Sequence, residues 1–375
     1  MMNSVNVPVV TDAAKKKREP LFHITKRNSV GWPLALGIRA GAIICAILFM
    51  SVVFVVLSKQ NPLVLFGSMI EGVFGNKMRT MILFSNTAIL LGISLALTPA
   101  FKMKFWNCGG EGQVIIGSLV TAMVMLFVGD SVPYPLLVTI MIVSSVAVGA
   151  IWALIPAIFK SRWNTNETLF TLMMNYIAIQ CVTYFLKVFG NAQGNLEPMP
   201  QFALPKLFGD KYWLNIIIIA VTCILMYVYL RYSKHGYEIS VVGESERTAK
   251  YIGINVPKVI IRTMIISGAL CGLVGFMLVA NGSCAVTTTI TGGRGFTAIL
   301  VSWLAKFNPI YMVLTSFLVI FLQQGTSYMG DIYRLDTSMA DIFIGVVLLF
   351  IIGCEFFINY KINFKKSSHE NKEVA

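Results

Sequence analysis

Long apolar runs recur along this chain, each bounded by charged residues, proline or glycine. A helix of about 20 mainly apolar residues crosses the hydrocarbon core of a bilayer, so runs near that length predict membrane spans. One run, 296–306, is too short to cross alone and predicts a half-helix or re-entrant piece whose backbone is covered by protein. The ten predicted spans are 38–58, 82–99, 113–129, 134–158, 168–187, 213–231, 261–281, 296–306, 309–325 and 339–358.

The composition agrees with a polytopic membrane protein. Of the 375 residues, 56% are hydrophobic and 13% are charged, whereas a soluble globular protein carries about 25% charged residues. The apolar content excludes a disordered chain, and seven cysteines without a C-x-x-C pair exclude a disulfide-stapled module. The predicted fold is an all-α membrane helix bundle, with a basic tail at 1–37, a transmembrane domain at 38–358 and a second tail at 359–375.

The basic residues predict how the chain is oriented. With ten alternating crossings from a cytoplasmic N-terminus, 22 of the 30 lysines and arginines fall on inside segments, as the positive-inside rule requires. We therefore expect both termini to be cytoplasmic and 188–212 to form an outside loop available to an external partner. This orientation toward the lipid surface accounts for the net charge of +13, and no basic stripe interleaved with aromatic residues points to nucleic acid.

The catalytic motifs that would identify an enzyme are absent. His23, His235 and His369 all lie in the predicted inside loop or tails, so they form no intramembrane metal site. The sequence has no H-E-x-x-H, no G-x-S-x-G and no G-x-x-x-x-G-K-[ST] element. We therefore predict a protein that is not an enzyme and carries no cofactor, and any energy from ATP must arrive through another protein.

Two polar segments lie next to predicted spans. The first, 105–113, brings three glycines together with Asn107, Glu111 and Gln113. A carboxylate near membrane depth is costly and faces protein or water, so Glu111 either caps the following helix or serves transport directly. The second runs from Asn166 and Glu167 to Asn175, where polar residues at 168, 171 and 175 form a stripe on one helix face. Such a stripe either joins helices by hydrogen bonds or lines a pathway.

The longest internal inside loop contains a well-specified short helix. Within 236–256, acidic residues come first, Ser245 is placed to cap the N-terminus, and Gly253 is placed to end the helix. Some eight residues reach only about 12 Å, so this helix cannot span the membrane. We expect it to lie on the cytoplasmic face and to present Ala249, Tyr251 and Ile252 to another molecule. In the span that follows, Ser267, Gly268, Cys271, Gly272 and Gly275 form a small-residue face that favours close helix packing.

In this order, these segments resemble the permease subunits of ATP-binding-cassette importers of the ribose and nucleoside type, over about 80–356. The string N-C-G-G-E-G-Q at 107–113 is similar to the family's N-I-G-A-E-G-Q, and N-E-T-L-F-T-L-M-M-N-Y at 166–176 is similar to N-E-V-I-x-T-L-M-x-N-Y. The segment V-G-E-S-E-R-T-A-K-Y-I-G-I-N-V at 242–256 resembles the cytoplasmic coupling segment. Departures are Cys108, Gly110, and Lys306, which stands where the family usually has glycine.

The resemblance implies a nucleoside importer of a bacterial plasma membrane. It implies three partners: a second permease, which is usually a different chain, a cytoplasmic ATPase that binds the ATP, and an external lipid-anchored binding protein. This chain looks like the larger permease of the pair. The predicted pathway residues are Asn107, Glu111, Gln113, Asn166, Glu167 and Asn175. The predicted ATPase-coupling residues are Gly243, Glu244, Ser245, Glu246, Arg247, Ala249, Ile252 and Gly253.

One alternative is an ion-coupled secondary transporter of a small polar solute. In that case, intramembrane acids such as Glu111 and Asp341 would be the coupling sites. The sequence shows no convincing inverted repeat of broken helices, which disfavours this alternative.

Overall fold

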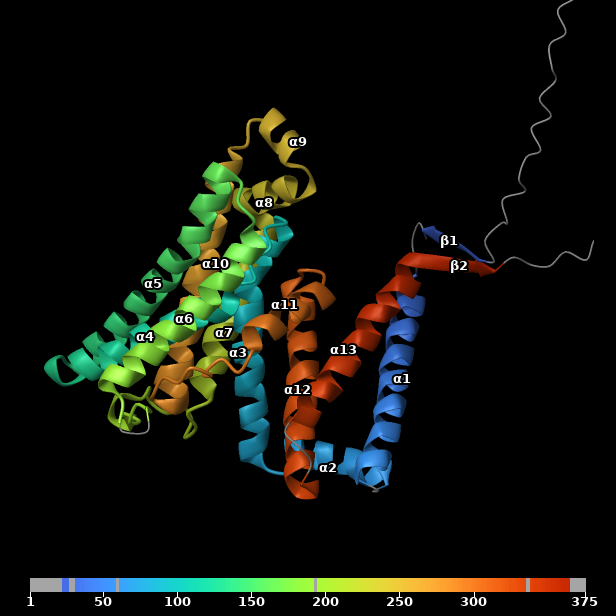
Figure 1. Ribbon diagram of the computed structural model, residues 1–375, viewed down its shortest axis with the longest axis horizontal. Coiled ribbons are helices and arrows are strands. Elements are labelled where there is room, and N and C mark those ends of the chain that lie inside the picture. The colour runs from blue at the N-terminus through green and yellow to red at the C-terminus, as the bar shows by residue number, and fades with distance from the viewer. Residues whose placement is uncertain (1–21, 27–30, 59–60, 192–193, 335–337, 365–375) are drawn as a thin grey trace, which may run out of the picture. The chain divides into compact units, whose positions relative to one another are not determined.

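The computed structural model of the chain is a bundle of helices (Figure 1), and it describes residues 22–26, 31–58, 61–191, 194–334 and 338–364. In the described part, eight helices are long and apolar enough to cross a membrane. The prediction of an all-α, polytopic membrane fold is confirmed. The prediction that both termini are cytoplasmic stays a prediction.

The helices follow the predicted spans closely, with a few additions. The helices are α1 (Trp32–Ser58), α2 (Pro62–Phe74), α3 (Lys77–Lys102), α4 (Gly110–Val128), α5 (Tyr134–Trp163), α6 (Glu167–Phe189), α7 (Trp213–Tyr232), α8 (Lys234–Glu244), α9 (Glu246–Tyr251), α10 (Val256–Leu278), α11 (Arg294–Leu304), α12 (Pro309–Tyr333) and α13 (Ser338–Asn359). Two short 3-10 turns, Gly129–Ser131 and Pro200–Phe202, a π-helical turn, Val279–Ser283, and two strands, β1 (Phe22–Lys26) and β2 (Tyr360–Phe364), complete the structure.

Asparagine caps fix where many of these helices begin. The side-chain oxygens of Asn61, Asn76 and Asn308 each accept a hydrogen bond from a backbone N–H in the first turn of α2, α3 and α12. In α2 and α12 a proline follows the cap directly, where its fixed φ suits the first turn and its missing N–H costs no hydrogen bond. Asn166 and Asn255 cap α6 and α10 in the same way. These caps satisfy backbone donors of the first turn that have no partner within the helix.

The chain divides into two compact units, 1–48 with 349–375, and 49–348. In the first unit, β1 and β2 pair antiparallel, from Phe22 opposite Phe364 to Lys26 opposite Tyr360. Both strands of this ribbon fall within the predicted tails at 1–37 and 359–375, and the predicted division into tails and transmembrane domain stays a prediction. The rest of the predicted tails includes 1–21 and 365–375, which lie outside the described residues.

The second unit is built around α10, which packs against α3, α4 and α5. The small-residue face predicted for α10 makes these contacts. A side chain on Gly268 would overlap the backbone of Gly149 in α5, and one on Gly272 would overlap the backbone of Ser145. Ser145 donates a hydrogen bond to the carbonyl oxygen of Gly272 at 3.0 Å. The small residues are therefore needed for close packing, as predicted.

The segment 296–306 was predicted as a half-helix, and the structure agrees. Helix α11 has 11 residues, so it reaches only about 16 Å and cannot cross a bilayer. Gly292 and Gly293, both with positive φ, lead into it from an irregular stretch. Such backbone is tolerated at membrane depth only where protein or a water-filled cavity surrounds it.

Helix α2 was not predicted as an element. Its 13 residues fall below the length of a span, and it lies across the direction of α3 and α12 in Figure 1. The face formed by Leu65, Met69 and Val73 is buried, while Leu63 and Ile70 are exposed. Gly72 lies against the ring of Tyr328 in α12. Sequence reasoning that searched for full spans could not find such a short helix.

The substitution Gly272→Leu should destabilise the protein strongly, because the new side chain would overlap the backbone of α5. Overpacking a well-packed core costs about 1 to 3 kcal/mol, and a clash with backbone lies at the upper end of that range. The free energy of unfolding in mixed micelles measures this effect. Gly67→Ala in α2 is the control, because no atom lies within 4 Å of the added methyl group. Equal stability of the two variants would contradict the packing described above.

Candidate functional site

The carboxylate of Glu111 is bound to the N-terminus of α11. Its Oε1 accepts a hydrogen bond from the backbone N–H of Gly293 at 3.1 Å and another from the Thr291 hydroxyl. Its Oε2 accepts from the backbone N–H of Gly295 at 2.7 Å. Helix α11 receives no side-chain cap from its own N-cap residue, so Glu111 satisfies donors that would otherwise be orphaned. Sequence reasoning placed Glu111 correctly in the first turn of α4 but could not show that its hydrogen bonds go to α11.

Close backbone approach makes this contact possible. Gly295 lies directly against the backbone and carboxylate of Glu111, so that a Cβ at this position would meet Glu111 atoms at 2.5 to 2.6 Å. The next residue toward the N-terminus, Arg294, donates a hydrogen bond to Asn86 of α3 at 3.2 Å. Thr291, Gly293 and Gly295 were missed as site residues. The glycine-rich run T-G-G-R-G at 291–295, which stands just before an apolar stretch, was the signal that could have found them.

Asn107 anchors the irregular segment that leads into α4. Its amide nitrogen donates to the hydroxyl of Ser267 in α10 at 3.1 Å, and its amide oxygen accepts from the backbone N–H of Gly109 and from the side chain of Gln113. Ser267 lies eleven residues beyond the start of α10, about 16 Å along that helix. The start of α4 is therefore well inside the bundle, and 103–109 forms a re-entrant connection.

Asn175 and Thr171 of α6 hold the other side of the same connection. The Asn175 amide oxygen accepts from the backbone N–H of Gly112 at 2.8 Å, and its amide nitrogen donates to the carbonyl oxygen of Cys108 at 2.9 Å. The Thr171 hydroxyl accepts from the backbone N–H of Cys108 at 3.1 Å. The polar stripe predicted on this helix thus bonds to backbone, as the first of its two proposed roles requires.

Asn166 and Glu167 lie at the N-terminus of α6 and have local partners. Asn166 is exposed and caps the helix through the backbone N–H of Leu169 at 3.1 Å. Glu167 forms an ion pair with Lys160 of α5 at 2.9 Å. The side chains of these two residues therefore stand apart from the buried polar network, by which we mean Asn107, Glu111, Gln113, Thr171, Asn175 and Ser267. Only the backbone carbonyl of Glu167 contacts it, by accepting a hydrogen bond from the Thr171 hydroxyl at 2.7 Å. The pathway role predicted for the six candidate residues stays a prediction.

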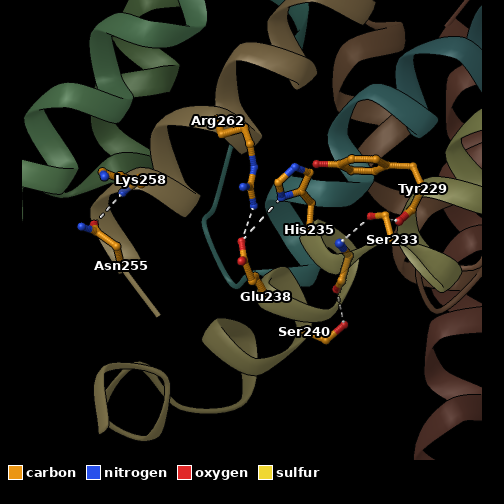
Figure 2. A network of polar contacts seen from close by, with 9 residues as sticks. Tyr229, Ser233, His235, Glu238, Ser240, Asn255, Lys258 and Arg262 are labelled. Atoms are coloured by element: carbon orange, nitrogen blue, oxygen red, sulfur yellow. Dashed lines mark hydrogen bonds and ion pairs between the residues drawn. The ribbon is translucent and has the colours of Figure 1, made fainter. Parts of the chain in front are cut away.

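A second group of polar residues braces α8 against α10 (Figure 2). Arg262 of α10 donates to the Glu238 carboxylate at 2.8 Å, and the Nδ1 of His235 lies 3.7 Å from the same oxygen. The hydrogen bond from Arg262 lowers the pKa of Glu238 below its ordinary value of 4.5, while partial desolvation of the carboxylate opposes this shift. A carboxylate whose pKa is lowered by folding contributes its full stabilisation at any pH above its ordinary pKa. The contribution of this ion pair is therefore lost only as the pH falls through the lowered pKa of Glu238.

The short helix predicted in 243–254 is present as α9. Ser245 caps it by accepting from the backbone N–H of Thr248 at 3.3 Å, and Gly253 follows with φ of +85°, the left-handed conformation predicted for it. Tyr251 is 92% exposed and Ile252 is 49% exposed. Figure 1 shows α8 and α9 at one end of the bundle, which we call the α8–α9 end.

Two predicted coupling residues are buried within the protein. Ala249 has no exposed surface, so the prediction that it is presented to another molecule is wrong. A six-residue helix that lies on the bundle must bury one side, and Ala249 is on that side. Gly243 is also buried, and its Cα lies against the backbone of Lys102 at the end of α3. Three other predicted coupling residues, Glu244, Glu246 and Arg247, are exposed.

The opposite end of the bundle is covered by the loop predicted at 188–212. The backbone N–H of Met199 donates to the carbonyl of Cys284, and that of Leu204 donates to the carbonyl of Ala280, both at 3.0 Å. The ring of Phe202 lies against Gly129 at the end of α4. Within the described residues, no group of three or more histidine, cysteine, aspartate or glutamate side chains is placed to hold a metal ion.

Comparison with known proteins identifies the relatives of this chain. Residues 77–352 match the family described as branched-chain amino acid transport system / permease component. The glucose ABC transporter permease protein TsgB13 of Haloferax volcanii is 26% identical, over 73% of this chain and 75% of that protein. Two guanosine ABC transporter permease proteins of Bacillus subtilis also match. NupP is 30% identical over 70% of this chain and 77% of its own length, and NupQ is 27% identical over 54% and 67%. No solved structure matches the chain.

The substitution Glu111→Gln should weaken the junction between α4 and α11, because an amide lacks the charge that strengthens hydrogen bonds from backbone N–H groups. Hydrogen bonds to a charged group contribute about 1.5 to 3 kcal/mol each, so we expect a loss of about 2 kcal/mol in the free energy of unfolding. Denaturation of the purified protein in mixed micelles measures it. Glu71→Gln, at an exposed position in α2, is the control. An unchanged stability for Glu111→Gln would show that the charge is not needed.

Proposed function

Because the chain belongs to the family of permease components of branched-chain amino acid transport systems, we propose that it is the transmembrane permease of an ATP-driven importer that moves nucleosides into a bacterial cell. The two guanosine permeases among its relatives support this substrate class, and the glucose permease marks a sugar as the nearest alternative. The chain contributes a pathway and a mechanical receiver, while a partner ATPase binds and hydrolyses the ATP.

The observation that carries the proposal is the exposure of α9. A tyrosine that is 92% exposed beside a half-exposed isoleucine is poorly placed in water, and the exposed polar residues Glu244, Glu246 and Arg247 precede these two residues in the same short segment. An apolar centre with a polar rim is the usual composition of a protein interface. We therefore assign Tyr251 and Ile252 to the contact with the ATPase, and the α8–α9 end becomes the cytoplasmic end.

A force on α9 has a direct route into the bundle. Helix α8, which precedes α9, is fixed to α3 by the contact between Gly243 and Lys102 and to α10 by the ion pair between Glu238 and Arg262. Helix α10 in turn packs closely on α4 and α5. Movement of α8 as a rigid piece would shift the helices at the centre of the unit, which is what alternating access between inward and outward openings requires.

The buried polar network supports a pathway beside it. The irregular segments 103–109 and 284–293 both run into the bundle and are held there by Asn107, Glu111 and Asn175, and we place this junction at membrane depth. Non-helical backbone at that depth is tolerated where it is buried in protein or lines a solute cavity, and in transporters it commonly borders the binding site. We propose that the network acts on the pathway by fixing this backbone, and that Gln113, Asn166 and Glu167 act near it.

The proposed partners follow from the same assignment. A second permease, an ATPase and an external lipid-anchored binding protein complete the importer. The presence of two different guanosine permeases in one Bacillus supports a pair of unlike permeases. The loop at 190–212, bonded to the end of α10, is the proposed contact for the binding protein.

Ion-coupled transport is less well supported. A coupling carboxylate must gain and lose a proton or an ion during the cycle, whereas both oxygens of Glu111 accept hydrogen bonds from the start of α11. The second candidate acid, Asp341, is exposed in the first turn of α13. A coupling site needs a buried carboxylate that can exchange a proton or ion, and neither Glu111 nor Asp341 meets both conditions.

The function is tested with the complete complex of both permeases and the ATPase in proteoliposomes, with the binding protein outside and ATP enclosed. We expect guanosine to accumulate only with ATP and to stop accumulating when vanadate is enclosed, because the ATPase supplies the energy. Accumulation driven by a proton or sodium gradient without ATP would instead establish the ion-coupled alternative.

The coupling surface gives a sharper prediction. Ile252→Asp and Tyr251→Ala should each lower binding-protein-stimulated ATP hydrolysis by tenfold or more, because hot-spot contacts at an interface centre contribute about 2 kcal/mol or more. Lys250→Gln, an exposed neighbour on the same helix, is the control and should keep most of the stimulation. Assembly of the variant complexes is checked by gel filtration. Full stimulation in both variants would move the coupling surface to the connection between α5 and α6.

A further inference from the structure

A cavity lined by basic residues lies at the α8–α9 end of the bundle, outside the site described above. Its volume is about 220 Å³, and it is formed where the ends of α3 and α7 meet the start of α12. Lys102, Arg231 and Lys306 all line it, together with Asn308 and Pro309. We call it the basic pocket. A water molecule takes about 30 Å³ in the liquid, so the basic pocket has room for a group of several heavy atoms.

The charge of the basic pocket is of one sign. No acidic residue lines it. Within the described residues, neither the Lys102 ammonium nor the Arg231 guanidinium has an ion-pair partner in the structure. Lys102 is half-buried, where water screens its charge less than at the open surface. Bringing cations together in this way is unfavourable unless an anion joins them.

The start of α12 adds to the positive potential. This helix has 25 residues, and its N-terminus, at Pro309, forms part of the pocket wall. The side chain of Asn308 accepts from the backbone N–H of Ile310 at 3.1 Å, which fixes the first turn. The N-terminus of a helix favours anions by about 0.3 to 1 kcal/mol at exposed sites. Here it acts together with three cationic side chains.

The backbone of the pocket wall is strained. Lys306 and Phe307 are consecutive and both adopt the left-handed conformation, with φ of +51° and +58°. Glycine adopts this conformation without steric cost, whereas lysine and phenylalanine do not. The strain is held by hydrogen bonds from Lys306 to Trp303 and from Phe307 to Ser302, and by stacking of Phe307 on Phe101. Strained residues that the surroundings hold in place cluster at ligand sites, and here one of the two strained residues is a lysine that lines the pocket.

We propose that the basic pocket binds a phosphate group. Lysine and arginine side chains and a helix N-terminus are the groups that bind phosphate in proteins. Two sources offer this chemistry at a cytoplasmic face: the headgroup of an anionic phospholipid and a soluble phosphate compound. Ile310, Tyr311 and Leu314, which follow the pocket along α12, are all exposed and apolar, so an acyl chain would have a surface to lie on. The proposal does not depend on which solute the protein carries.

Thermal unfolding of the purified full-length chain in a nonionic detergent provides the test. The probes are short-chain phosphatidylglycerol, short-chain phosphatidylcholine and inorganic phosphate. We expect phosphatidylglycerol to raise the midpoint temperature of unfolding at a concentration at least tenfold lower than phosphatidylcholine needs for the same increase. If inorganic phosphate raises the midpoint as effectively as phosphatidylglycerol, the source is soluble phosphate, and if only phosphatidylglycerol does so, the source is lipid. Equal protection by both lipids, without protection by inorganic phosphate, would assign the effect to acyl chains and overturn the proposal.

Variants connect the effect to the pocket. Lys102→Gln with Arg231→Gln should weaken the response to the effective probe by tenfold or more, and the charge-conserving Arg231→Lys should retain it. Lys250→Gln, an exposed lysine of α9 that does not line the pocket, is the matched control. If the double variant unfolds, Lys306→Gly serves in its place, because glycine suits the left-handed conformation at that position. A wild-type response in a folded variant that lacks these cations would overturn the proposal.

Discussion

Backbone amide and carbonyl groups within a bilayer must be hydrogen-bonded by the protein itself, and this constraint shapes the centre of the molecule. The chain is irregular at two places inside the bundle, at 103–109 and at 284–293. Backbone groups of both segments are satisfied at one junction. Glu111 lies in the first turn of α4, which follows 103–109, and its carboxylate accepts hydrogen bonds from the backbone N–H groups of Gly293 and Gly295, where 284–293 leads into α11. Asn107 ties the first segment to Ser267 of α10, and Asn175 holds it from α6. These polar side chains thus form the hydrogen bonds with backbone groups that water forms in surface loops.

The helices and their local caps could be predicted from the sequence, because the signals lie within a few residues of one another. Ser245 and Gly253 bracket α9 as expected, and the 11 residues of α11 are too few to span. The partners of Glu111 could not be predicted, since they lie 180 or more residues further along the chain. The burial of Ala249 depends equally on tertiary packing, which a short local pattern does not contain.

Small residues let the irregular segments and the regular helices coexist. Gly268 and Gly272 bring α10 to backbone contact with α5, and Gly295 brings α11 to backbone contact with Glu111. At such distances, a rotation of one helix cannot be absorbed by side chains and must move its neighbour. The same close approach at Gly243 ties α8 to the end of α3. The bundle is therefore stiff where a permease must transmit movement.

The ribbon of β1 and β2 has a consequence for how the protein is made. The first strand leaves the ribosome before any span, whereas its partner follows all of them in the sequence. The membrane-spanning helices between the two strands must therefore enter the membrane while β1 has no partner, and the ribbon closes only after α13 has been synthesised. Pairing of such distant segments carries a loop-closure entropy that local helices do not. Formation of the ribbon therefore reports that α1 to α13 have all been synthesised.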